Sequence, residues 1–320
     1  MPRFTAADAR RLTAVRAARR PLGHLVWSTL GDLSLTTAQL QTALAQAGLA
    51  PTPPPIHPRH AAERATAALA CDPPSAGTRL FVRPVIEGPG ILIRMLVYEE
   101  TDPAGRVLRF TQCARLAWSD AEPDRLTIDP LAAPDALPAL AATALDRLPA
   151  LFAAARDTYP ASMLRTLANR ILAGTHAIAV RSAGSVRFVP AAFAAQTQAY
   201  VRLYEAFRAV SGHPDTEAYA VQVAERAAHR LVIRRAAERD LGDRLDAWTR
   251  EVAALLQQPT LADGVLERRA AQLAELRAAL ATYQQLTADQ LATLQTKLDA
   301  AATVLQAALL RATPDQAVPA

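Results

Sequence analysis

Four arginines on a predicted helix and hairpin are the residues of this chain best suited to bind a ligand. The predicted elements are a helix at 161–172, a tight β-hairpin at 176–189 and a helix at 190–210. In a winged helix, a helix enters the DNA major groove and the hairpin touches the backbone. On that hypothesis the nucleic-acid contacts come from Arg165, Arg170, Arg181 and Arg187. The favoured interpretation is a structural joint between the two halves of the chain, because the proline-interrupted segment before it is a poor start for a helix-turn-helix.

The chain contains none of the short motifs that mark common catalytic or cofactor sites. Gly makes up only 12 of 320 residues, and neither a glycine-rich phosphate loop nor a Gly-x-Ser-x-Gly elbow occurs. His57 and His60 have a spacing that suits two metal ligands, but the sequence places no third ligand near them. We therefore predict no catalytic residues, no metal and no cofactor. An enzyme whose site is assembled only in the fold remains a hypothesis, because catalytic triads are spatial.

The two cysteines and the apolar runs bear on where the protein works. Cys71 and Cys113 lie far apart and form no Cys-x-x-Cys pair, which argues against a zinc site and a disulfide scaffold. A reducing cytoplasm is the expected compartment. No apolar run approaches the roughly 18 residues that a membrane helix needs. We therefore expect no membrane association.

The formal net charge is +5, and Lys297 is the sole lysine among the basic residues. A GC-rich genome that favours arginine codons explains this composition without a ligand. The basicity therefore permits an acidic partner without requiring one. Six arginines lie in the first twenty residues, where Thr5–Arg20 is predicted to be a helix. This helix is either a phosphate-contacting arm or a solvated N-terminal helix.

Residues 78–118 have the bulky, alternating pattern of an antiparallel sheet. The turn signals Gly88-Pro89-Gly90 and Asp102-Pro103-Ala104-Gly105 divide the segment into strands at about 79–87, 91–100 and 106–118. The solvated face is expected to carry arginines at positions 79, 83, 94, 106, 109 and 115 in some register. A basic sheet face can bind nucleic acid, but the stacking aromatic set of sheet-type RNA binders is missing. A solvated charged face is therefore the favoured interpretation.

The remainder of the chain is predicted to be helical. One long helix is expected at 215–257, and two shorter helices follow it, with short connections that favour antiparallel neighbours. The two shorter helices carry leucines at heptad spacing, which predicts packing or oligomer contacts at Leu273, Leu276, Leu280, Leu291, Leu294, Leu298 and Leu305. The sequence thus predicts an antiparallel three-helix bundle or coiled-coil hairpin.

Two local signals predict helix starts. Thr36 followed three residues later by Gln39 has the pattern of a capping box. Pro190 is expected at the first position of a helix, where its missing N–H has no consequence.

The hairpin also resembles a pattern found in other proteins. The stretch Ala177-Ile178-Ala179-Val180-Arg181, Gly184, and Val186-Arg187-Phe188-Val189-Pro190 is similar to an apolar-Arg-x-x-Gly-x-x-Phe-Val-Pro hairpin of uncharacterised phage and bacterial mobile-element proteins. The stretch Gly23-His24-Leu25-Val26-Trp27 is similar in the same way. The resemblance covers about sixty residues and implies no activity, because the group has no known function.

These observations predict an α+β chain that is predominantly helical. We expect a basic N-terminal helix (1–20), an α+β head (21–158), a helix–hairpin–helix joint (159–212), a helical coiled-coil or bundle domain (213–312) and a disordered tail (313–320). The favoured function is a non-enzymatic interaction or scaffold protein that self-associates or docks onto a protein partner through its helices. The alternatives are nucleic-acid binding through the sheet face and hairpin, and an enzyme.

Overall fold

A computed structural model of the chain describes the residues between position 21 and position 312, apart from six short gaps. The described ranges are 21–50, 52–70, 77–102, 106–133, 136–181, 185–258 and 264–312. The predicted helix Thr5–Arg20 and the predicted tail from Thr313 lie outside them. The chain divides into two compact units that alternate along the sequence. Unit 1 comprises Met1–Asp32, Ala43–Leu49 and Met163–Ala320, and unit 2 comprises Leu33–Thr42 and Ala50–Ser162.

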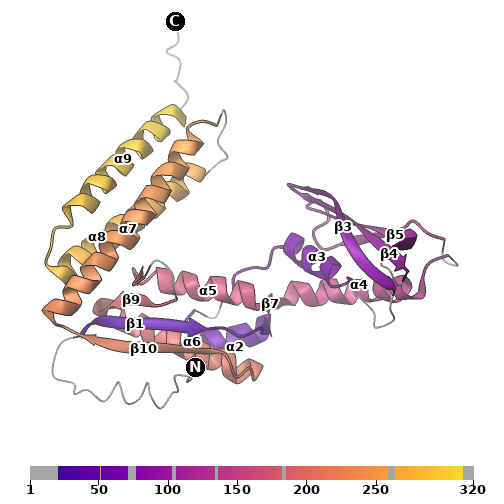
Figure 1. Cartoon of the computed structure of the whole chain (residues 1–320), viewed down its shortest axis with the longest axis horizontal. Coiled ribbons are helices and arrows are strands. Elements are labelled where there is room, and N and C mark those ends of the chain that lie inside the picture. The colour runs from indigo at the N-terminus through magenta and orange to yellow at the C-terminus, as the bar shows by residue number, and fades with distance from the viewer. Residues whose placement is uncertain are drawn as a thin grey trace, which may run out of the picture. The chain divides into compact units, whose positions relative to one another are not determined.

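Unit 1 is built on a four-stranded sheet that joins distant parts of the chain. Its strands are β1 (Pro21–Thr29), β8 (Ile178–Ala179), β9 (Arg187–Pro190) and β10 (Glu217–Ala224), in the order β10-β1-β9-β8. Figure 1 shows β1 between β9 and β10. Strand β1 pairs with both neighbours in antiparallel fashion.

The two faces of this sheet are covered by different helices. On one face Val26 and Val189 are buried against Tyr200 and Tyr204 of α6 (Ala194–Ser211). Ser28 Oγ lies 2.8 Å from the hydroxyl of Tyr200, which adds a polar tie between β1 and α6. On the other face Phe188 and Ile178 pack in the core of the C-terminal helices.

The predicted single helix at 215–257 is wrong, because its first part is strand β10. The helix α7 begins only at Ala227 and ends at Leu255. In β10, Tyr219, Val221 and Val223 recur at every second position, which is the period of a strand. Trp27 and Tyr219 are cross-strand partners, and their rings stack with centroids 5.4 Å apart. These aromatic and β-branched residues favour a strand, and pairing with β1 stabilises it.

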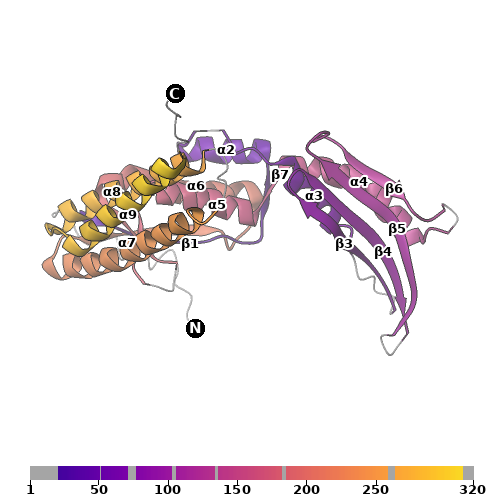
Figure 2. The same ribbon diagram turned by 90° about the horizontal axis from the view of Figure 1, so that it is seen from above.

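Three C-terminal helices, α7, α8 (Val265–Thr287) and α9 (Ala292–Ala312), pack on one another around a common core. Figures 1 and 2 both show them side by side. The core holds six of the seven leucines predicted from heptad spacing, namely Leu273, Leu280, Leu291, Leu294, Leu298 and Leu305, and Leu276 packs against it partly buried. Their packing is thus within the chain, and self-association through the same helices stays a prediction.

Unit 2 contains a second four-stranded sheet in meander order. Its strands are β3 (Thr78–Gly88), β4 (Ile91–Thr101), β5 (Val107–Ser119) and β6 (Leu126–Pro130). The three predicted strands are confirmed within a few residues, and the predicted turn Gly88-Pro89-Gly90 connects β3 to β4. Residues 103–105 of the second predicted turn lie outside the described ranges. Figure 2 shows β3, β4 and β5 as long, curved neighbours. A short pair, β2 (Ser34–Thr36) and β7 (Thr158–Pro160), completes the strands of unit 2.

Helices α3 (Pro58–Ala67) and α4 (Ala139–Asp157) pack on one face of the β3–β6 sheet. Alanines 61, 62 and 65 of α3 allow close approach, and Leu148 and Phe152 of α4 fill the space beside Trp118. This core shares no residue with the core of the C-terminal helices. The sheet of unit 2 is thus covered on one face by its own two helices.

Of the two helix starts predicted from local residues, one is confirmed and one is wrong. The capping box at the start of α2 (Thr37–Ala47) is confirmed, because Gln39 N donates to Thr36 Oγ1 and Thr36 N donates to Gln39 Oε1. The expected role of Pro190 is wrong. It is the last residue of β9 and precedes a short 3-10 helix, Ala191–Phe193, before α6 begins. Its φ of −59° suits both positions, so ring geometry alone does not decide between them.

The α+β class is confirmed by these elements. Within the described ranges, none of the helices is long and apolar enough to cross a membrane.

Candidate functional site

The structure places the four arginines predicted to contact nucleic acid on α5, on β9 and just after β8. Arg187 lies in β9, an inner strand, opposite Val26 of β1. Arg165, on α5 (Ala161–Ala173), is exposed and donates to the carbonyl of Leu30 at 3.4 Å. Arg181 follows β8 and borders residues 182–184, which are outside the described part. Both hairpin strands, β8 and β9, thus belong to the sheet of unit 1, and nucleic-acid binding by these residues stays a hypothesis.

The fourth arginine, Arg170, lines a cleft of about 680 Å³ between the end of α5 and helices α7 and α8. Arg244 and Arg269 also line it, but each already has a carboxylate partner. Arg244 pairs with Asp240 at 2.6 Å, and Arg269 pairs with Glu251 at 2.5 Å. Most of the positive charge in this cleft is therefore compensated within the chain.

His176 contributes to the same cleft from the turn that follows α5. Its backbone has a φ of +54°, and its carbonyl accepts a hydrogen bond from the hydroxyl of Tyr283 at 2.9 Å. Burial lowers the pKa of its imidazole, partly opposed by the charge of Glu275. The unusual backbone is thus held by a contact with α8, and this contact accounts for it without a ligand.

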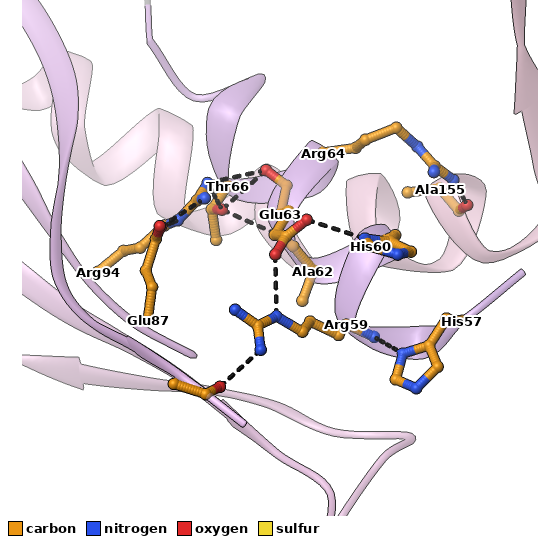
Figure 3. Close-up of polar contacts among 11 residues, drawn as sticks. His57, Arg59, His60, Ala62, Glu63, Arg64, Thr66, Glu87, Arg94 and Ala155 are labelled. Carbon is orange, nitrogen blue, oxygen red and sulfur yellow. Dashed lines mark hydrogen bonds and ion pairs between the residues drawn. The ribbon is translucent and has the colours of Figure 1, made fainter. Parts of the chain in front are cut away.

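A polar network fixes α3 on the sheet of unit 2 (Figure 3). Glu63 accepts from Arg59 Nε at 3.0 Å, and it lies 3.0 Å from His60 Nδ1. Burial alone would raise the pKa of Glu63, but the hydrogen bonds and charges of His60 and Arg59 bring it below its usual value. Arg94 of β4 donates to the carbonyl of Glu63 and to Thr66 Oγ1, both at 3.0 Å. The network therefore holds α3 to β4.

The histidine pair belongs to this network and has structural partners. His57 Nδ1 accepts from Arg59 N at 3.2 Å and so caps the start of α3, while His60 binds Glu63. The two rings are 5.8 Å apart between centroids. In the part of the chain that the structure describes, no three His, Cys, Asp or Glu side chains gather as a metal site.

The other face of the β3–β6 sheet is the most unusual surface of unit 2, and we call it the open face. Cross-strand partners share a face, so the register defines which side chains it presents. They are Arg79, Phe81, Arg83 and Ile86 of β3, Ile91, Ile93, Met95, Val97 and Glu99 of β4, Phe110, Gln112, Arg115, Ala117 and Ser119 of β5, and Thr127 and Asp129 of β6. The helix-covered rows alternate with these and contain Leu80, Leu92, Leu96, Leu116 and Trp118.

One end of the open face is apolar and reaches solvent. Ile86 is 47% exposed and Ile91 is 36% exposed, while Ile93 and Met95 between them are half-buried. Bulky apolar side chains on a sheet are normally buried by a second layer. This end of the open face therefore has the character of a surface that a partner covers.

The other end of the open face is an ordered group of arginines and phenylalanines. The guanidinium carbon of Arg83 lies 5.0 Å from the ring centre of Phe81 and 5.3 Å from that of Phe110. Arg79 lies 5.2 Å from the ring of Phe81, and it also pairs with the buried carboxylate of Glu99 at 2.7 Å. Cation–π contacts of this geometry hold a guanidinium in place while its N–H groups stay available.

The expected set of sheet arginines therefore separates into three groups. Arg79, Arg83 and Arg115 lie on the open face, whereas Arg94 faces α3. Arg106 and Arg109 pair with acidic residues near the β4–β5 turn, with Asp102 at 2.8 Å and Glu100 at 3.8 Å. The prediction of one solvated basic face was wrong, because Arg94 lies on the face of the sheet that the helices cover.

The charge of the chain after position 20 does not favour binding to a polyanion. The chain has 35 basic and 30 acidic side chains, and its first twenty residues hold six of the former and one of the latter. Residues 21–320 thus carry equal numbers of each sign. Within unit 2, eleven arginines face thirteen carboxylates. The open face thus lies on a unit without excess positive charge.

Sequence reasoning missed the pairing of Phe81 with Phe110 around Arg83. Two register shifts, one between Leu96 and Val97 and one between Glu100 and Thr101, decide which β5 residues share a face with Arg83. A β-bulge reverses the alternation beyond it and has no reliable signature in sequence. The alternation of Arg79, Phe81 and Arg83 was the one available signal.

A family model described as "Family of unknown function (DUF6744)" matches residues 21–314. No curated protein sequence and no solved structure matches the chain at a significant level.

Proposed function

Because the chain belongs to this family of unknown function, we propose its role from its geometry: it is a non-enzymatic interaction protein whose open face docks a partner protein. The observation that carries the proposal is an apolar sheet surface, with Ile86 and Ile91 exposed, beside arginines ordered on phenylalanine rings. Protein interfaces are enriched in Phe, Met and Arg, with charged groups at the rim. The open face has this composition and this arrangement.

The C-terminal helices form the second part of the proposal. They serve as a rigid element for oligomerisation or for docking onto a larger assembly, with coiled-coil packing of their leucine stripes. Because these leucines fill an intrachain core, contacts with another molecule would use the outer helix faces, where Leu231 and Val232 of α7 are exposed. A role in a phage or mobile element, in the cytoplasm, also belongs to the proposal and rests on the hairpin resemblance.

Nucleic-acid binding is the alternative function. The stacking of Arg83 on two aromatic rings supports it, since bases and guanidinium groups stack on such rings. The equal numbers of basic and acidic residues after position 20 speak against it. If the alternative holds, labelled DNA or RNA binds at low salt, and Arg181→Glu with Arg187→Glu weakens that binding. A catalytic site assembled in the fold, for example in the α5–α7–α8 cleft, remains a third alternative.

Site-specific photo-crosslinking in the cells that produce the protein tests the main proposal. A photoreactive phenylalanine analogue at Ile91 should give one defined protein adduct, because this exposed side chain lies within the proposed interface. The same analogue at Ala150, an exposed residue of α4, is the matched control and should give none.

Mass spectrometry of the adduct identifies the occupant. A different protein supports the docking of a partner, and a second copy of the chain supports self-association through the same face. A nucleic-acid adduct would support the alternative function. The absence of an adduct at Ile91, or equal adducts at Ile91 and Ala150, would contradict docking at the open face.

A further inference from the structure

We infer that the open face recognises a protein segment that places a carboxylate on Arg83 and apolar side chains on the neighbouring row of β4. This inference rests on the proposed function and names the chemistry of the partner. It depends on three observations: the order of the Arg83 side chain, the absence of an acidic partner for it within the described chain, and the exposed apolar residues beside it.

Arg83 is held in place before any partner binds. Its guanidinium lies between two rings, 5.0 Å from the centre of Phe81 and 5.3 Å from that of Phe110. A long side chain normally loses conformational entropy when it enters an interface. Because the two rings already restrict Arg83, part of that loss has occurred in the unbound protein, and the planar group presents its N–H edge for bidentate recognition of an oxyanion.

Arg83 is also the arginine of this face whose charge is uncompensated. Arg79 pairs with Glu99 at 2.7 Å, and Arg115 pairs with Asp129 at 2.8 Å. Arg83 forms no ion pair with any residue in the described ranges. Glu99 cannot readily turn to Arg83, because its side chain is almost fully buried beneath Arg79. The missing anion is therefore expected from the partner.

The surroundings of Arg83 select a protein carboxylate over a nucleic-acid phosphate. Its cross-strand neighbour is Met95, and the next row of the same face contains Ile86 and Ile93. Apolar side chains of a partner would cover these residues and remove water from the ion pair, which strengthens it. A phosphate backbone offers no comparable apolar surface, and unit 2 carries slightly more acidic than basic residues.

Peptide selection against the full-length chain tests this inference. A phage library of short random peptides is the probe, and binding of individual peptides is then measured by fluorescence anisotropy. We expect the enriched peptides to share an Asp or Glu within an apolar stretch. Arg83→Gln should weaken their binding about tenfold, because it removes one charge-assisted pair, and Arg83→Lys should have a smaller effect.

Arg147→Gln is the matched control, since it makes the same chemical change at an exposed arginine of α4. It should leave peptide affinity within about twofold. A third variant, Ile93→Asp, probes the apolar row and should abolish the binding of the same peptides. Circular dichroism of each variant confirms that it is folded.

The outcomes separate the inference from the function on which it rests. Enriched peptides that lack acidic residues, or that bind Arg83→Gln as well as Arg147→Gln, would overturn the recognition of a carboxylate while leaving a docking face. Peptides whose binding is unaffected by Ile93→Asp would overturn docking at the open face itself. Tight binding of a labelled single-stranded oligonucleotide that Arg83→Gln abolishes would assign the site to nucleic acid instead.

Discussion

Individual polar residues in this protein mostly have structural roles. His24 shows how the burial of a polar side chain affects stability. His24 lies on β1, is 7% exposed, and has a buried Nδ1 for which the described residues offer no hydrogen-bond partner. Burial lowers the pKa of His24 below its usual value of 6.5. A buried histidine of this kind is held neutral, because charging it without a partner is unfavourable.

The protein should therefore lose stability in mild acid. Below the unfolded pKa of about 6.5, the unfolded state binds more protons at His24 than the folded state, so the free energy of unfolding falls as pH decreases. Burial lowers the pKa of His176 as well, so it contributes in the same direction. The free energy of unfolding can be measured by urea denaturation at about pH 7.5 and about pH 5.5. It should differ less between these two pH values for His24→Gln than for the wild type.

The control for this prediction is His60→Gln, because the His60 side chain is 62% exposed. It should leave the pH dependence of unit 1 unchanged. Equal pH dependence in the wild type and in His24→Gln would show that His24 is not the group responsible.

At the scale of elements, β1 lies against β9 at Gly23 without room for a side chain. A Cβ placed on Gly23 would lie 2.2 Å from the carbonyl oxygen of Val189 and 2.5 Å from the ring of Phe188. Atoms cannot remain at such distances, and the obstacle includes backbone. Gly23 is therefore required by the packing of two strands that are distant in sequence.

Gly23→Ala should destabilise unit 1 by about 2 kcal/mol, within the usual range for overpacking in a core. Gly88→Ala is the matched control, since the nearest atom to its added Cβ would be 3.6 Å away, in ordinary contact. Thermal denaturation followed by circular dichroism compares the two variants. Similar melting temperatures for both would contradict the packing argument.

The elements that sequence predicted well are those set by neighbouring residues. The β3–β4–β5 meander depends on two local turns, and the start of α2 depends on Thr36 and Gln39. Strand β10 was missed because its partner, β1, lies about 190 residues earlier in the chain. The Arg83 site was only partly foreseen for the same reason: its aromatic neighbour Phe110 is brought to it by register shifts in the β4–β5 pair.

At the scale of the whole molecule, the C-terminal helices of unit 1 and the sheet of unit 2 have separate hydrophobic cores within the described residues. One contains Leu245 and Trp248 of α7 together with buried residues of α8 and α9. The other contains Leu148 of α4 and Trp118 of β5. Each unit thus has the buried apolar cluster that a folding unit requires. Substitutions in one core should therefore act mainly on the unit that contains it.

Leu148→Ala and Leu245→Ala form a matched pair that tests this separation. Each removes the same atoms from a side chain that is at most 2% exposed, so each should lower the stability of its unit by about 2–4 kcal/mol. Hydrogen exchange measured by mass spectrometry should show faster exchange in β3–β6 for Leu148→Ala, with α7–α9 unchanged. Leu245→Ala should show the reverse. Equally faster hydrogen exchange in both units for either variant would mean that the two cores unfold together. The two units would then be separate in structure but not in their stability.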